Sequence, residues 1–162
     1  MKKEETGFDR FPTAELTSVD GLSSLRFCAI DYAFPETTER GDDADWQKNE
    51  VAINIPGIGV RIEETVFQGH WLEIFLGEFK KLLSHEREEM HFGPTEPYFG
   101  LIFSYDQQKE IVVDASVDYP HSNGARLEFT FRTDAVRIKR FTKGIEAILE
   151  RFPSRWAERK AV

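Results

Sequence analysis

Residues 98–132 contain three runs in which apolar and polar side chains alternate with period two. The apolar positions are Phe99, Leu101, Phe103, Ile111, Val113, Ala115, Val117, Leu127, Phe129 and Phe131. The polar positions are Glu110, Asp114, Ser116, Asp118, Arg126, Glu128, Thr130 and Arg132. Successive side chains of a β-strand point to opposite faces of its sheet, so the alternation predicts three half-buried strands. Turn-rich connectors join the runs, and together they predict a β-meander with one apolar face.

Three further strands are predicted before residue 64. Residues 22–34 carry apolar side chains on both faces, as expected of a strand covered on both sides, and Pro35 would end it. Residues 50–55 and 58–63 alternate on either side of Pro56-Gly57, which favours a hairpin whose register the pattern leaves open. Because Pro-Gly favours a type II turn over the primed turns of two-residue hairpins, we expect a longer loop.

Two amphipathic helices are predicted from apolar residues three and four positions apart. The first begins at Trp71 and carries the stripe Leu72, Phe75, Leu76, Phe79, Leu82 and Leu83. The second follows Asp134, a plausible N-cap, and carries Ile138, Phe141, Ile145, Ile148, Leu149 and Phe152 on one face. Pro153 is expected to end or kink this last helix.

The order of these elements, β-β-β-α-β-β-β-α, predicts an α+β domain. Short connections favour a largely antiparallel sheet of about six strands, with both helices packed on one face. We expect residues 1–20 to be a polar, partly ordered lead-in and residues 21–162 to form a single domain. A chain of 162 residues is long enough to bury a sizeable core without disulfides or metal ions.

The sequence offers no signal for export or membrane insertion. Cys28 is the single cysteine, so an internal disulfide is excluded, and its apolar neighbours favour a buried, unreactive thiol over a reactive one. Residues 1–9 are charged and lack the apolar run of a signal peptide, and no stretch approaches the length that spans a bilayer. We therefore expect a cytoplasmic protein that does not associate with membranes.

Charge is distributed unevenly along the chain, whose net charge is −8. Residues 134–162 hold eight Lys and Arg against four Asp and Glu, whereas residues 1–133 hold 13 against 25, so the body carries −12 and the last segment +4. An acidic body disfavours nucleic acid as a partner and favours a basic protein. The alternative is that acidity only keeps the protein in solution.

Residues 36–45 are the most acidic stretch, and we expect an exposed loop there.

No set of residues forms a recognised catalytic motif. The run 85–89, HEREE, begins like a helical zinc-protease motif but has Glu89 where the second histidine ligand would stand. His121-Ser122 lies in a turn-rich segment without a nucleophile elbow. Asp114, Ser116 and Asp118 could hold a cation or a pair of acid–base carboxylates, although a solvated strand face has the same pattern. We expect no catalytic residue, cofactor or metal site, and hence no enzyme.

One connector, residues 91–99, has two prolines, Pro94 and Pro97, that stiffen the entry to the meander. Phe92 and Phe99 are expected to anchor it in the core.

Several features together resemble the WapI-type immunity proteins over residues 44–155. They are a strand led by Trp46, the Pro-Gly hairpin, the first helical stripe, the connector FGPTEP at 92–97, the meander and a last helix ending in Phe152-Pro153. Those proteins are small bacterial cytosolic proteins that neutralise the toxic C-terminal domains of wall-associated polymorphic toxins. The resemblance implies binding without catalysis, and it transfers no functional residue.

Under this hypothesis the partner is a basic toxin domain. It contacts either the acidic loop through Asp42, Asp43, Asp45 and Trp46 or the strand face through Asp114 and Asp118. An aromatic anchor inside an acidic rim suits an interface hot spot. A small-ligand-binding protein or enzyme, with its site between sheet and helices, is the alternative. A third possibility is that the basic last helix contacts an acidic partner or RNA through Arg137, Arg140, Lys143 and Arg151.

Overall fold

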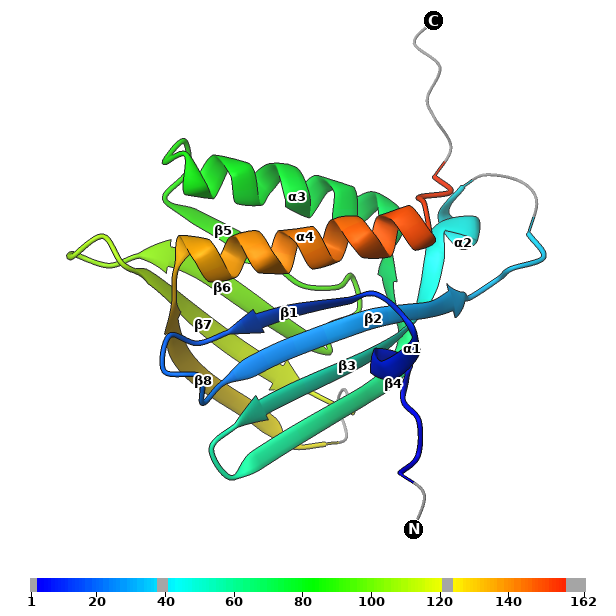
Figure 1. The fold of residues 1–162 in the computed structure, drawn as a ribbon, viewed down its shortest axis with the longest axis horizontal. Coiled ribbons are helices and arrows are strands. Elements are labelled where there is room, and N and C mark those ends of the chain that lie inside the picture. Colours follow the sequence, from blue (N-terminus) through cyan, green and yellow to red (C-terminus); the bar gives the residue numbers. More distant parts are fainter. Residues whose placement is uncertain (1–2, 38–40, 121–123, 157–162) are drawn as a thin grey trace, which may run out of the picture.

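The computed structural model describes residues 3–37, 41–120 and 124–156 (Figure 1). The first half of the described chain comprises α1 (Gly7–Arg10), β1 (Thr13–Thr17), β2 (Ser24–Tyr32), α2 (Asp42–Asp45), β3 (Trp46–Ile55) and β4 (Ile58–Gln68). The second half comprises α3 (Gly69–Leu83), β5 (Glu89–Phe92), β6 (Phe99–Tyr105), β7 (Ile111–Asp118), β8 (Arg126–Thr133) and α4 (Ala135–Arg151). The three strands of the predicted meander are confirmed as β6, β7 and β8.

The described strands form two antiparallel sheets of four, β1-β2-β3-β4 and β5-β6-β7-β8. In Figure 1 the helices α3 and α4 run side by side along one side of the two sheets. The α+β class is therefore confirmed, but the prediction of a single sheet of about six strands is wrong. It omitted β1 and β5, which are only five and four residues long. Because β1 lies at Thr13–Thr17, the first sheet begins inside the stretch that we expected to be a lead-in.

The hairpin between β3 and β4 is tighter than expected. Ile55 pairs with Ile58, so Pro56 and Gly57 alone form the loop, and the prediction of a longer loop is wrong. Pairing of Val51 with Ile62 keeps branched side chains on one buried face, and that burial sets the register. Gly57 has a φ of +80°, which a type II turn requires at its third position.

A buried amide holds the irregular end of β4. The pairing of β3 with β4 shifts between Trp46 and Lys48. There, the side-chain oxygen of Asn49 accepts hydrogen bonds from the backbone N–H groups of Val66 (3.3 Å) and Phe67 (2.9 Å). Its amide nitrogen donates to the carbonyl of Cys28 at 3.2 Å. These bonds satisfy backbone groups that the shift removes from the ladder, and β4 can then lead directly into α3.

The space between the sheets and the helices is filled with aromatic rings. Phe67 and Phe92 have ring centroids 5.6 Å apart, and Phe79 and Phe141 meet edge to face at 5.8 Å. All four side chains are buried. Phe92 and Phe99 are buried as predicted. The described residues therefore leave a packed layer where we considered a ligand site between sheet and helices.

The two predicted helices are confirmed with small shifts of their bounds. α3 begins at Gly69, two residues before Trp71. Asp134 caps α4 as predicted, because its side chain accepts a hydrogen bond from the Arg137 N–H at 2.9 Å. None of the helices in the described ranges is long and apolar enough to cross a membrane.

The N-terminal residues cover the outer face of the first sheet. The backbone N–H of Gly7 points at the carboxylate of Glu50, 3.1 and 3.2 Å from its two oxygens, and Arg61 pairs with the same carboxylate at 3.1 Å. Cys28, which pairs with Glu50 across β2 and β3, is buried as predicted. Burial, together with the negative charge of Glu50, raises the pKa of the Cys28 thiol to about 11.

Candidate functional site

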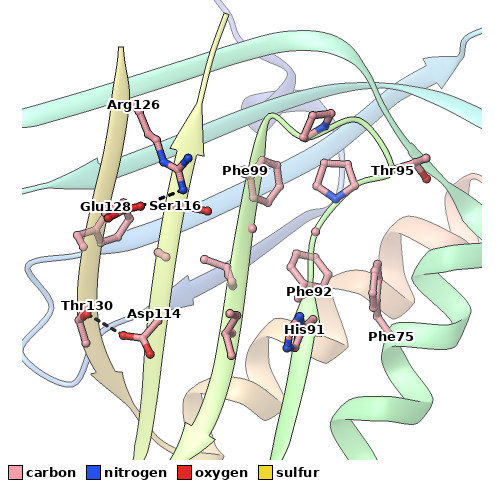
Figure 2. A pocket seen from close by; sticks show the side chains of 18 of the residues that line it. Phe75, His91, Phe92, Thr95, Phe99, Asp114, Ser116, Arg126, Glu128 and Thr130 are labelled. Atoms are coloured by element: carbon pink, nitrogen blue, oxygen red, sulfur yellow. Dashed lines mark hydrogen bonds and ion pairs between the residues drawn. The ribbon is translucent and has the colours of Figure 1, made fainter. Parts of the chain in front are cut away.

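A hollow lies along the solvent side of the second sheet, with a cavity volume of about 930 Å³. We call it the outer groove. Its floor consists of residues of β5 to β8 on the face of the sheet that is turned away from the core: His91, Gly100, Ile102, Asp114, Ser116, Arg126, Glu128 and Thr130. Figure 2 shows the polar side chains of β7 and β8 on one side of the groove and Phe75 and Thr95 on the other.

Small side chains make the middle of this face concave. Strand register places Gly100 opposite Ser116, and Ser116 opposite Glu128. The neighbouring row runs from Ile102 to Asp114 and Thr130. A glycine and a serine at the centre leave open the space that larger residues would fill, so the groove follows directly from the residues on the polar face of the meander.

Aromatic and proline residues close the other side of the groove. Trp71 and Phe75 of α3 lie beyond β5, and the stiff connector contributes Pro94 and Thr95. Trp71 is 42% exposed and Ile102 is 36% exposed, which gives the groove two large apolar side chains in contact with solvent. Exposed aromatic residues of this kind are common anchors in protein interfaces.

The polar side of the groove carries more negative than positive charge. Asp114 is exposed and accepts a hydrogen bond from the Thr130 hydroxyl at 2.8 Å. Arg126 and Glu128 form an ion pair of 2.9 Å. Within the described chain no Lys, Arg or His lies within ion-pair distance of Asp114, so its charge is available to a partner.

Asp114 and Asp118 share one face of β7, as the alternation predicts. Asp118 is half-buried at the end of the strand and lies opposite Arg126. The two acids thus belong to the same surface.

The predicted acidic loop has a different character. Residues Asp42–Asp45 form α2, and Asp45 is completely buried. Its carboxylate accepts hydrogen bonds from the N–H of His70 (2.8 Å), the hydroxyl of Ser154 (2.9 Å) and the N–H of Arg155 (2.7 Å). The expectation that Asp45 is exposed in a contact loop is therefore wrong, because the side chain holds together three segments of its own chain.

The remaining residues of that predicted site lie apart from Asp114 and Asp118. Asp43 is exposed and Trp46 is half-buried, whereas the Asp42 side chain lies outside the described set. Trp46 begins β3 and pairs with Gln68, just before α3. The structure therefore places the two predicted sites on different sheets.

Other candidate chemistry finds little support. Among the described residues no group of three or more His, Cys, Asp or Glu side chains is arranged to hold a metal ion. His85 stacks on Tyr105 with ring centroids 4.7 Å apart, and His91 contacts Glu89 at 2.9 Å. His121 and Ser122 lie outside the described residues.

Trp71 and Ile102 were not predicted as site residues. The helical stripe assigned Trp71 only to the start of a helix, and Ile102 stands on a face that is otherwise polar. An isolated apolar residue on a polar strand face was the available signal for Ile102.

Comparison with known proteins identifies a family. A family model described as the immunity protein WapI-like family matches residues 15–153. No curated protein matches the chain. A solved structure titled "Crystal structures of trypanosoma bruciei MRP1/MRP2" is similar at 9% identity and a TM-score of 0.46, over 94% of this chain and 98% of that chain. The family match spans most of the chain and includes the residues on which the resemblance rested, so this protein belongs to the WapI-like immunity protein family.

Proposed function

We propose that this protein neutralises a bacterial toxin domain by binding it, without catalysing a reaction, and that the outer groove is the contact surface. Membership of an immunity protein family supports the toxin as partner. The observation that supports the location is the groove itself, an open concave face that combines an exposed Trp71 with an exposed Asp114, whose carboxylate is hydrogen-bonded to Thr130 but forms no ion pair among the described residues.

The chemistry of the groove favours a basic partner. Asp114 of β7 and Glu128 of β8, which lies beside Arg126, supply two carboxylates that line the groove, and Asp118 lies further along the same face of β7. The net charge of −8 on the chain would steer a positively charged domain toward it from a distance. A basic domain would gain attraction at this surface, whereas nucleic acid would be repelled by it.

The groove also suits binding better than catalysis. Interface hot spots cluster around a few aromatic anchors enclosed by polar residues. In the groove, the exposed Trp71 and Ile102 share one surface with the polar residues Asp114 and Thr130. Asp43 and Trp46 form a second acidic and aromatic surface near the start of α3, which we propose as an additional contact. Since immunity proteins of this type act inside the bacterial cell, we propose a cytoplasmic location.

A direct binding measurement tests the proposal. The purified full chain is mixed with a catalytically inactivated form of the toxin domain encoded beside its gene, and the complex is measured by calorimetry. The same protein is then added to the active toxin domain. We expect a stoichiometric complex that weakens with salt and abolishes toxin activity. A toxin domain that neither binds nor loses activity would overturn the proposal.

A further inference from the structure

We propose that the toxin domain adds an extended segment to the free edge of β8, as a fifth strand of the second sheet. This inference rests on the proposed function and specifies how the partner binds. It follows from the direction in which the backbone groups of β8 point.

Two hydrogen bonds fix that direction. The N–H of Asp118 in β7 donates to the carbonyl of Tyr98 at 2.9 Å, toward β6 and away from β8. Arg126, which lies opposite Asp118, therefore directs its own N–H and C=O away from β7. At the other end of β8, the carbonyl of Arg132 accepts from the N–H of Val19 at 2.8 Å, and it too points outward.

Backbone groups alternate in direction along a strand, so both observations assign the outward direction to the even-numbered residues of β8. Between Arg126 and Arg132 these are Glu128 and Thr130. Among the described residues, nothing forms a hydrogen bond with the backbone N–H or C=O of either one. An open edge with unpaired groups is a template for another strand.

The other sheet edges are less suitable. α4 packs against β1 so closely that a Cβ at Gly144 would lie 2.5 Å from the Cα of Ala14. At β5, the ring of Phe92 packs against Phe75 of α3 at 4.8 Å, with the helix alongside the strand. β4 is also an edge strand, but none of its residues lines the outer groove. β8 is the edge that continues into the proposed contact surface, through Glu128 and Thr130.

The two faces of β8 define the chemistry of the added segment. On the groove side it would lie beside Glu128 and, one strand further, Asp114, so a Lys or Arg is favoured there. On the opposite side it would cover Leu127 and Phe129, which are only half-buried, and an apolar residue is favoured. The segment is therefore extended and alternates basic with apolar residues. The charged side chains of Arg126 and Glu128 along the edge disfavour pairing with unmatched strands.

Hydrogen exchange of single amides provides the test. Isotope-labelled full-length protein is measured by NMR, free and bound to the inactivated toxin domain encoded beside its gene. We expect the amides of Glu128 and Thr130 to exchange at least about tenfold more slowly in the complex. The amides of Leu127 and Phe129 face β7 and should be protected in both states.

A complex that forms without slower exchange at Glu128 and Thr130, or with protection along β4 instead, would overturn this inference and leave the proposed function intact. Failure of the toxin domain to bind at all would overturn both.

A matched pair of variants gives an independent measurement. Thr130→Pro removes the backbone N–H of residue 130. Because this N–H points away from β7, the hydrogen bonds between β7 and β8 are retained. Thr130→Val keeps the N–H and serves as the control. We expect Thr130→Pro to weaken toxin binding about tenfold or more and Thr130→Val to weaken it clearly less. Equal affinities of the two variants, with folding verified by thermal unfolding, would contradict strand addition.

Discussion

The carboxylate of Asp45 accepts a hydrogen bond of 2.8 Å from the backbone N–H of His70 at the start of α3. α3 has no acidic residue in its own first turn, so Asp45 supplies from another segment the negative charge that a helix N-terminus favours. The other carboxylate oxygen binds Ser154 and Arg155, which connects the end of β4 and α3 to the chain beyond α4.

Asp45→Ala should destabilise the protein strongly. The substitution leaves three donors without their acceptor in a buried position, and we expect a loss of about 3 kcal/mol in the free energy of unfolding. Urea denaturation monitored by circular dichroism measures it. Asp43→Ala, at an exposed position of the same short helix, is the control and should change stability by less than about 0.5 kcal/mol. Similar stabilities of the two variants would contradict a structural role for Asp45.

The burial of Asp45 could not be predicted from the sequence. Its partners His70, Ser154 and Arg155 lie 25, 109 and 110 residues away, and no local pattern connects them. In an acidic stretch, composition alone favours solvent exposure. Burial of one carboxylate among several depends on tertiary contacts that a linear pattern does not contain.

Elements with a regular period were predicted well for the opposite reason. β7 alternates through all its eight residues because one face packs on the core and the other faces solvent. β1 and β5 each bury only two side chains on that period, Ala14 with Leu16 and Met90 with Phe92, which is too short a signal to separate from a loop. The shared strand face of Asp114 and Asp118 follows from the alternation, and Asp114 lines the groove. Trp71 reaches the groove only because α3 packs beside β5, which no local pattern shows.

Substitution by alanine should have opposite effects on stability at two glycines within helices. A Cβ at Gly144 would lie 2.5 Å from the Cα of Ala14, whereas a Cβ at Gly77 meets nothing within 4 Å. Gly144→Ala must push α4 away from β1, and we expect a loss of about 1 to 3 kcal/mol in the free energy of unfolding. Gly77→Ala should add about 0.5 to 1 kcal/mol, since alanine favours the helix. Thermal unfolding distinguishes them, and a stabilising Gly144→Ala would contradict the close approach.

Stability at alkaline pH should depend on Cys28. The pKa of its thiol is about 11 in the folded protein against an ordinary value of 9.0. As pH rises above 9, the unfolded thiol ionises first, so the folded state loses about 2 to 3 kcal/mol by pH 11. Burial of Tyr32 and Tyr105 raises their pKa values as well, and they add to the same trend.

Cys28→Ala isolates the thiol from the tyrosines, because they are present in both proteins. We expect the free energy of unfolding to fall less steeply between pH 9 and 11 in Cys28→Ala than in the unmodified protein. Parallel pH profiles in urea denaturation would show that Cys28 does not contribute.

Asp114 should act mainly on the rate of toxin association. Asp114→Asn removes the charge but keeps an oxygen that can accept from Thr130, so the fold should be retained. We expect slower association and a weaker dependence on salt, with little change in dissociation, when binding is followed by surface plasmon resonance at several ionic strengths. Glu15→Gln, on the exposed side of β1, is the control for lost charge outside the groove. If both variants reduce the association rate equally, the effect comes from net charge rather than from the groove.

Trp71 should carry a large share of the binding free energy if the groove is the contact surface. The residue is 42% exposed, and its ring centroid lies 6.3 Å from that of the buried Phe75, so the ring is supported by the core side of α3 in the free protein. Trp71→Ala should weaken toxin binding by about 2 kcal/mol or more, chiefly through faster dissociation. Ile74→Ala offers a matched control, because Ile74 is 37% exposed on the same helix but does not line the groove. A loss of affinity in Ile74→Ala that equals the loss in Trp71→Ala would shift the contact from the groove to the outer face of α3.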